Sequence, residues 1–128
     1  DTATDDAIAK ALKLKADIII LAPCCHKYVR KRIEIPEDLS AVFKHGILEE
    51  HIASFITDGL RALMLESFGY ETKVFEFISS EHTGKNIMIT AVKTEMTEEE
   101  KLNSIVEMEK MKAKFGLKDF YLDKIITK

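Results

Sequence analysis

The 128-residue sequence has few of the features that mark secreted or membrane proteins. Its only two cysteines are adjacent, at Cys24 and Cys25, so they do not make the disulfide framework of a secreted domain, and a reducing, cytoplasmic setting is favoured. No apolar run is long enough to span a bilayer, and the polar opening at 1–6 is not a signal peptide. The net charge is only −3, so no global electrostatic field indicates nucleic acid or a membrane as partner.

Several motifs with known chemistry are also absent. The sequence contains no G-x-G-x-x-G loop, no P-loop, no G-x-S-x-G elbow and no metalloprotease helix. No repeat, low-complexity stretch or interdomain linker divides the chain, and its length allows one domain with a sizeable core. We therefore expect a single domain.

A strand at 17–22 is the most informative element that is present. Its continuous apolar run is typical of a strand buried on both faces in a parallel sheet. In open α/β sheets, ligands bind outside the carboxyl ends of such strands. The residues that follow this strand, from Pro23 to His26, are therefore expected at a functional site.

Hydrophobic periodicity and turn residues predict the other elements. Four helices are expected. The first ends at about Lys13 after a capping-box-like Thr2-x-x-Asp5, and a short second helix ends near Gly46. The third ends at 68 before a Gly69 stop, the fourth runs from a Thr97 cap to 115, and strands are expected at 70–78 and 86–93. The short connection between the two strands predicts an antiparallel hairpin. The strand–helix–strand order before it predicts a right-handed crossover and a parallel pair between 17–22 and 70–78. Half of a doubly wound α/β sheet is the simplest interpretation.

The Cys24-Cys25-His26 run has the residue types that zinc prefers. Adjacent residues that leave a strand point to opposite faces, which argues against both thiols binding one ion. A redox role is weaker, because C-x-x-C is absent and vicinal disulfides are strained. The structural alternative is that one cysteine packs as a small hydrophobe while the histidine caps the loop.

A basic run follows at once, formed by Lys27, Arg30, Lys31 and Arg32. In an acidic protein, such a patch beside a ligand site favours an anionic substrate, of which RNA is the interesting case. A solvated helix face explains the same pattern equally well.

The turn at 79–86 carries four polar side chains that can form hydrogen bonds or transfer protons, namely those of His82, Thr83, Lys85 and Asn86. If 70–78 runs parallel to 17–22, this turn lies on the same rim of the sheet as His26. A polar turn with Gly84 at a positive φ is the structural alternative.

Four segments together resemble the class I S-adenosylmethionine-dependent methyltransferases of bacteria and archaea that carry a Cys-Cys-His box. They are Asp-Thr-Ala-Thr-Asp-Asp-Ala at 1–7, Ala-Pro-Cys-Cys-His at 22–26, Lys-His-Gly-Ile-Leu-Glu-Glu at 44–50 and Ser-Glu-His-Thr-Gly-Lys-Asn at 80–86. Eukaryotic tRNA 2′-O-methyltransferases with a comparable box are related to this family. The resemblance covers about 1–93, the expected carboxyl-terminal half of the methyltransferase domain, and leaves 94–128 as a helical extension of the same domain. It implies a Rossmann-like sheet in which 17–22, 70–78 and 86–93 are the fifth, sixth and seventh strands. The seventh strand is antiparallel and lies beside the sixth.

The resemblance also implies roles for single residues. The methyl-bearing end of S-adenosyl-L-methionine would be bordered by Asp1, Thr2, Thr4 and Pro23. The catalytic region would consist of Cys24, Cys25, His26 and His82, with His26 as the preferred base. The methyl acceptor, with RNA as the candidate, would be held by Lys27, Arg30, Lys31, Arg32, Lys85 and Asn86.

The sequence departs from the family pattern in one respect. The glycine-rich cofactor loop and the acidic ribose-binding residue that the family carries earlier in its fold are absent. We therefore expect the carboxyl-terminal half of a methyltransferase fold, weak cofactor binding by this chain alone, and an exposed sheet edge that favours self-association. Two alternatives stay open. One is a non-enzymatic binding module that uses the last helix through Leu102, Ile105, Met108, Met111 and Phe115; the other is a Cys/His metal-binding protein.

Overall fold

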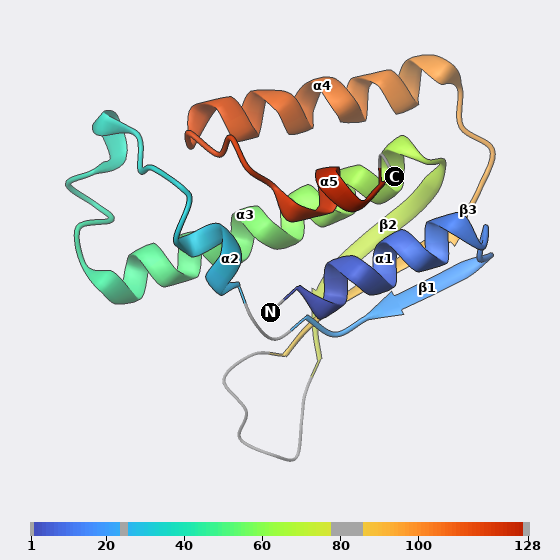
Figure 1. Ribbon diagram of the computed structural model, residues 1–128, viewed down its shortest axis with the longest axis horizontal. Coiled ribbons are helices and arrows are strands. Elements are labelled where there is room, and N and C mark those ends of the chain that lie inside the picture. Colours follow the sequence, from blue (N-terminus) through green and yellow to red (C-terminus); the bar gives the residue numbers. More distant parts are fainter. Residues whose placement is uncertain (1, 24–25, 78–85, 127–128) are drawn as a thin grey trace.

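A computed structural model describes residues 2–23, 26–77 and 86–126 (Figure 1). Its elements are α1 (Ala3–Lys13), β1 (Ile18–Leu21), α2 (Lys27–Arg30), the 3-10 turn η1 (Glu37–Leu39), α3 (Gly46–Ser67), β2 (Tyr70–Glu76), β3 (Ile87–Lys93), α4 (Glu98–Lys114) and α5 (Tyr121–Ile126). The long helices and the three strands form close to their predicted positions. The short helix predicted to end near Gly46 is replaced by η1, and α5 was not predicted.

The three strands form one sheet in the order β1-β3-β2 (Figure 1). The central strand β3 is antiparallel to both neighbours, so that Ala91 lies opposite Ile19 on one side and Thr72 on the other. The predicted hairpin between β2 and β3 is confirmed. The protein is therefore a mixed α/β fold with a small antiparallel sheet.

The predicted parallel pair between β1 and β2 is wrong. The two strands run in the same direction, but β3 lies between them, so the sheet of the described residues is not a parallel Rossmann-like sheet. The physical reason lies in β3. The hairpin folds this strand back along β2, and its buried residues Ile89 and Ala91 supply the apolar contacts beside β1 that the prediction gave to β2.

The core lies between one face of the sheet and α3. Residues of β1 alternate, since Ile19 and Leu21 are buried whereas Ile18 and Ile20 are 62% and 63% exposed. The prediction of a strand buried on both faces is therefore wrong, because the described helices cover only one face. The inward side chains pack in one cluster with residues of α1, α3, β2 and β3, including Ile8, Leu60, Leu65, Tyr70, Ile89 and Ala91.

The helix α4 packs mainly on α3 and extends along it (Figure 1). It does not pack on the sheet, since α3 already occupies that face. Of the apolar residues predicted on α4, Met108 and Phe115 are buried, whereas Leu102 is 59% exposed. Ile105 and Met111 are also exposed.

The helix ends follow the predicted capping pattern in part. The Thr97 hydroxyl accepts from the backbone N–H of Glu100 at 3.1 Å, and the Glu100 carboxylate accepts from the Thr97 N–H at 3.0 Å. Gly69 stops α3 with a φ of +92°, a conformation that favours glycine. The capping box predicted at Thr2 does not form, because the Asp5 carboxylate is directed to Arg61 instead.

Candidate functional site

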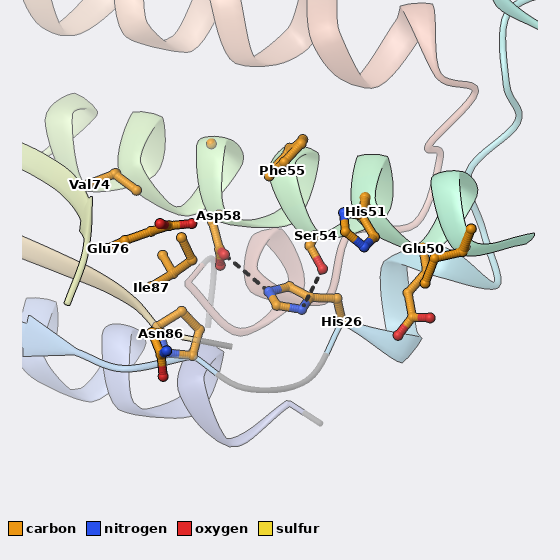
Figure 2. A pocket seen from close by; sticks show the side chains of 13 residues that line it. His26, Glu50, His51, Ser54, Phe55, Asp58, Val74, Glu76, Asn86 and Ile87 are labelled. Atoms are coloured by element: carbon orange, nitrogen blue, oxygen red, sulfur yellow. Dashed lines mark hydrogen bonds and ion pairs between the residues drawn. The ribbon is translucent and has the colours of Figure 1, made fainter. Parts of the chain in front are cut away.

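A pocket of about 570 Å³ opens where β1 and β2 end and β3 begins (Figure 2). Pro23 and His26 reach it from the loop after β1, Asn86 from the residue before β3, and Ser54 and Asp58 from α3. Because β1 and β2 run in the same direction, their carboxyl ends lie at the same rim of the sheet. His26, which follows 17–22, and Asn86, which follows 70–78, therefore line the same pocket.

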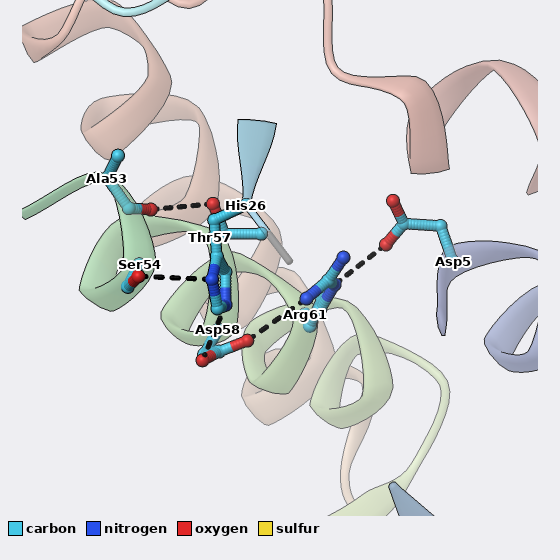
Figure 3. A network of polar contacts seen from close by, with 7 residues as sticks. All are labelled: Asp5, His26, Ala53, Ser54, Thr57, Asp58 and Arg61. Atoms are coloured by element: carbon cyan, nitrogen blue, oxygen red, sulfur yellow. Dashed lines mark hydrogen bonds and ion pairs between the residues drawn. The ribbon is translucent and has the colours of Figure 1, made fainter. Parts of the chain in front are cut away.

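The His26 imidazole is the centre of the polar wall of this pocket. The residue is 5% exposed, and both ring nitrogens are engaged. Nε2 lies 3.1 Å from Oδ2 of Asp58, and Nδ1 lies 3.0 Å from Oγ of Ser54 (Figure 3). Since a carboxylate only accepts hydrogen bonds, this geometry assigns the ring proton to Nε2 and leaves Nδ1 to accept the Ser54 hydroxyl proton.

A buried chain of ion pairs supports Asp58 from behind. Arg61 is 1% exposed, and its Nη1 donates to Oδ1 of Asp58 at 3.1 Å while its Nε donates to Oδ1 of Asp5 at 2.8 Å (Figure 3). A buried guanidinium is stable only when it is paired, and here two carboxylates pair with it. The network therefore connects α1, α3 and the loop after β1 through polar contacts.

The local sequence explains why these groups meet. Ser54, Asp58 and Arg61 are separated by four and three residues in α3, which places them on one face of the helix. Thr57 bonds back to the Ala53 carbonyl at 2.6 Å, so its hydroxyl does not compete for the network (Figure 3).

The remaining wall of the pocket is largely apolar. Phe55 is 68% exposed and meets the His51 ring edge-on, with the ring centroids 6.4 Å apart. Val74 and Ile87 line the opposite side, on β2 and β3 (Figure 2). An apolar, open-sided cavity with a few fixed polar groups is the usual character of a small-molecule site.

The other predicted residues are placed differently by the structure. Of the predicted cofactor residues that the structure describes, Pro23 lines the pocket, whereas Thr2 and Thr4 are not among its lining residues. Near the start of α1, the Tyr121 hydroxyl of α5 donates to Oδ1 of Asp6 at 2.8 Å, and this hydrogen bond is the main cause of the raised pKa of Tyr121. The predictions for Asp1, Cys24, Cys25, His82, Thr83, Gly84 and Lys85 fall outside the described residues.

The basic run is partly neutralised by contacts within the chain. Arg30 pairs with Glu50 at 3.7 Å, and Arg32 pairs with Asp119 at 3.0 Å while its guanidinium lies 3.7 Å from the centroid of the Tyr28 ring. Hydrogen bonds from Lys124, Tyr28 and Arg32 lower the pKa of Asp119 to about 2. Lys27 and Lys31 are exposed. An anion would therefore meet Lys27 and Lys31 before it displaced either arginine from its carboxylate.

The structure also bears on the metal and membrane alternatives, within the residues it describes. No three His, Cys, Asp or Glu side chains among 2–23, 26–77 and 86–126 are arranged to hold a metal ion, and both cysteines lie outside these ranges. Over the same ranges, no helix is long and apolar enough to cross a membrane.

Comparison with known proteins identified no relative of this chain. The chain matches no protein-family model, no curated protein and no solved structure. The functional argument therefore depends on the geometry of the pocket and on the residues that form it.

The prediction from sequence did not identify Asp5, Ser54, Asp58 or Arg61 as site residues. One signal for them was present. Residues 47–68 read as a helix with one broad apolar face, but Asp58 and Arg61 lie on the other side of that helix, where they flank the apolar residue Leu65. Charged residues in such positions are buried only when they are paired, so their i,i+3 spacing indicates a buried ion pair.

Proposed function

We propose that this chain forms the methyl-acceptor side of a class I S-adenosylmethionine-dependent methyltransferase. One observation carries the proposal: three of the four segments of the resemblance, which are far apart in the sequence, line one pocket, and the fourth is joined to its wall by buried ion pairs. Segment 22–26 supplies Pro23 and His26, 44–50 supplies Ile47 and Glu50, and 80–86 supplies Asn86. Segment 1–7 supplies Asp5, which reaches the pocket wall through Arg61 and Asp58.

The strand arrangement supports the same proposal. The resemblance implies a final antiparallel strand beside the sixth, and β3 is antiparallel and pairs along the whole of β2. It also implies that the strands at 17–22 and 70–78 share a direction, which β1 and β2 do. The setting that this proposal assumes is the cytoplasm, in keeping with the adjacent cysteines.

The described residues do not fit S-adenosylmethionine as a complete site. Of the predicted contacts, only Pro23 faces the pocket, and the sequence has neither a glycine-rich loop nor an acidic ribose partner at the expected place. The contribution that the geometry supports is to bind the acceptor and to accept its proton.

His26 does not contact an acceptor directly in this arrangement, because Ser54 and Asp58 occupy its two ring nitrogens. The route for the proton therefore runs through Ser54, which lines the pocket. An acceptor hydroxyl donates its proton to the Ser54 oxygen while Ser54 gives its own proton to Nδ1 of His26. The resulting imidazolium is stabilised by the Asp58 carboxylate, as in other serine–histidine–aspartate relays.

The acceptor that suits the cavity is a nucleoside of an RNA strand. The exposed ring of Phe55 offers a stacking surface for a base, a contact worth about 1–3 kcal/mol per base. Asn86 and Ser54 line the same pocket, and their polar groups can form hydrogen bonds with base edges or a ribose hydroxyl. Lys27 and Lys31 are available for flanking phosphates.

Two binding measurements on the full chain test the proposal. Fluorescence anisotropy with a labelled single-stranded RNA should show binding that Phe55→Ala weakens about tenfold, in line with the loss of one stacked base. The matched control Leu102→Ala, which truncates an exposed apolar side chain on α4, should leave the affinity unchanged. Absence of RNA binding, or equal weakening by both variants, contradicts an acceptor site in this pocket. In the second measurement, titration with S-adenosylmethionine should show no micromolar binding; micromolar affinity contradicts the restriction of this chain to the acceptor side.

A further inference from the structure

Among the described residues, β1 lies at one edge of the sheet, and a row of its backbone groups has no partner in the described strands. The N–H of Lys93 donates to the Asp17 carbonyl at 2.8 Å, which directs Asp17, Ile19 and Leu21 toward β3. Hydrogen bonding alternates along an antiparallel strand, so the N–H and C=O groups of Ile18 and Ile20 point away from the sheet. The same two residues expose their side chains on the outer face at 62% and 63%.

The two edges of the sheet differ in their protection. The other edge strand, β2, carries Glu71, Lys73 and Glu76 within its seven residues, and charges of this kind oppose pairing with another strand. The four residues of β1 are Ile18, Ile19, Ile20 and Leu21, without charge, proline or bulge. An unprotected apolar edge is a template for strand addition.

The sequence of β1 indicates which strand it receives. Ile18-Ile19-Ile20 reads the same in both directions, so a two-fold axis through Ile19 presents each strand with its own image. Antiparallel pairing about this axis places Ile18 of one copy opposite Ile20 of the other. Both residues direct their backbone groups to the open edge, so each such pair exchanges both N–H···O bonds.

We propose that the chain forms a symmetric dimer in which β1 of one copy pairs antiparallel with β1 of a second copy. The two sheets join into one sheet of order β2-β3-β1-β1-β3-β2, with the α3 helices of both copies on one face. On the other face, Ile18 and Ile20 of both copies form a continuous apolar row, extended by the exposed Val92 beside Ile18. This cross-strand packing stabilises the dimer in addition to the backbone bonds. The proposal does not depend on methyl transfer.

Sedimentation velocity on the full chain across a concentration series tests this proposal. The wild-type chain should pass from monomer to dimer, and Ile20→Lys should raise the dimer dissociation constant at least about tenfold because each dimer carries the charge twice. Ile18→Lys should act in the same way. The control Leu102→Lys adds the same charge at a similarly exposed apolar site on α4 and should leave the dissociation constant unchanged. Circular dichroism confirms that each variant is folded.

Amide hydrogen exchange gives a second, residue-specific test. Dimer formation should slow exchange at the amides of Ile18 and Ile20, whereas Thr72 and Val74 on the free edge of β2 should not change. A chain that stays monomeric at all concentrations overturns the proposal. So does a dimer that Leu102→Lys dissociates and Ile20→Lys does not, or one in which the protected edge is β2.

Discussion

Nε2 of His26 lies 3.1 Å from Oδ2 of Asp58, which joins the loop after β1 to the middle of α3. Asp58 also accepts a hydrogen bond from Nη1 of Arg61, and Nε of the same guanidinium donates to Asp5 in α1. The position of the imidazole is therefore set by three elements rather than by its own loop. This contact holds the polar wall of the pocket in place.

The first prediction concerns the protonation pattern of His26. Because Asp58 accepts at Nε2 and Ser54 donates at Nδ1, the neutral ring should carry its proton on Nε2. The ¹⁵N chemical shifts of the histidine ring, recorded on labelled protein, distinguish this tautomer from the other. In Ser54→Ala the tautomer should stay the same, since Asp58 is retained. A proton found on Nδ1 contradicts the relay.

The second prediction concerns the buried ion pairs. Arg61→Met leaves two buried carboxylates, Asp5 and Asp58, without their shared guanidinium. Removing one partner from a buried charge network typically costs about 3–5 kcal/mol of unfolding free energy. Urea denaturation at neutral pH measures this loss.

A neutral version of the network is the matched control for Arg61→Met. The triple variant Asp5→Asn, Asp58→Asn and Arg61→Met removes all the charges together and should recover most of the lost stability, because no unpaired charge remains buried. If Arg61→Met alone is as stable as the wild type, the network is not buried as described.

The third prediction is a pH dependence that follows from Asp119. Its pKa falls from the usual 3.8 to about 2 because Lys124, Tyr28 and Arg32 hydrogen-bond to the carboxylate. A carboxyl group with a lowered pKa in the folded state stabilises the fold above pH 3.8 and loses that contribution as the pH falls toward 2. Wild type should therefore be more stable than Asp119→Asn at neutral pH, and the difference should vanish in this acid range. A difference that persists unchanged at about pH 2 would contradict the stabilising role of the contacts of Asp119.

The fourth prediction concerns the capping box of α4. Thr97→Ala removes the hydroxyl that accepts from Glu100, and such substitutions cost about 1 kcal/mol. Thr2 occupies the corresponding position in α1 without a capping hydrogen bond, so Thr2→Ala should cost clearly less. Thermal or urea unfolding of the two variants measures both values. Equal losses would contradict the different capping of the two helices.

The sequence predicts the elements well, because periodicity and end signals are local. The apolar periodicity of 47–68 and the glycine at 69, which has a positive φ, define the extent of α3. The capping box of Thr97 and Glu100 defines the start of α4. The order of the strands in the sheet, by contrast, is not set by local signals. Whether β3 or β2 lies beside β1 depends on where a long crossover returns, and the local pattern of either strand allows both answers.

The candidate site was predictable only in part for the same reason. His26 and Asn86 follow from the rule that ligands bind beyond strand ends, which requires only the direction of β1 and β2. The partners of His26 required knowledge of which face of α3 meets the loop after β1. Asp5, 53 residues before Asp58, enters the site only through the tertiary position of Arg61, which no local signal specifies.

The most direct test of the central claim is to map an acceptor on the chain itself. In ¹H–¹⁵N correlation spectra of the full chain titrated with a short single-stranded RNA, the account predicts shifts centred on Ser54, Phe55 and Asn86, with none around Leu102 on α4. Shifts that gather on α4, or spectra that do not change at all, would contradict the assignment of this pocket as the acceptor site.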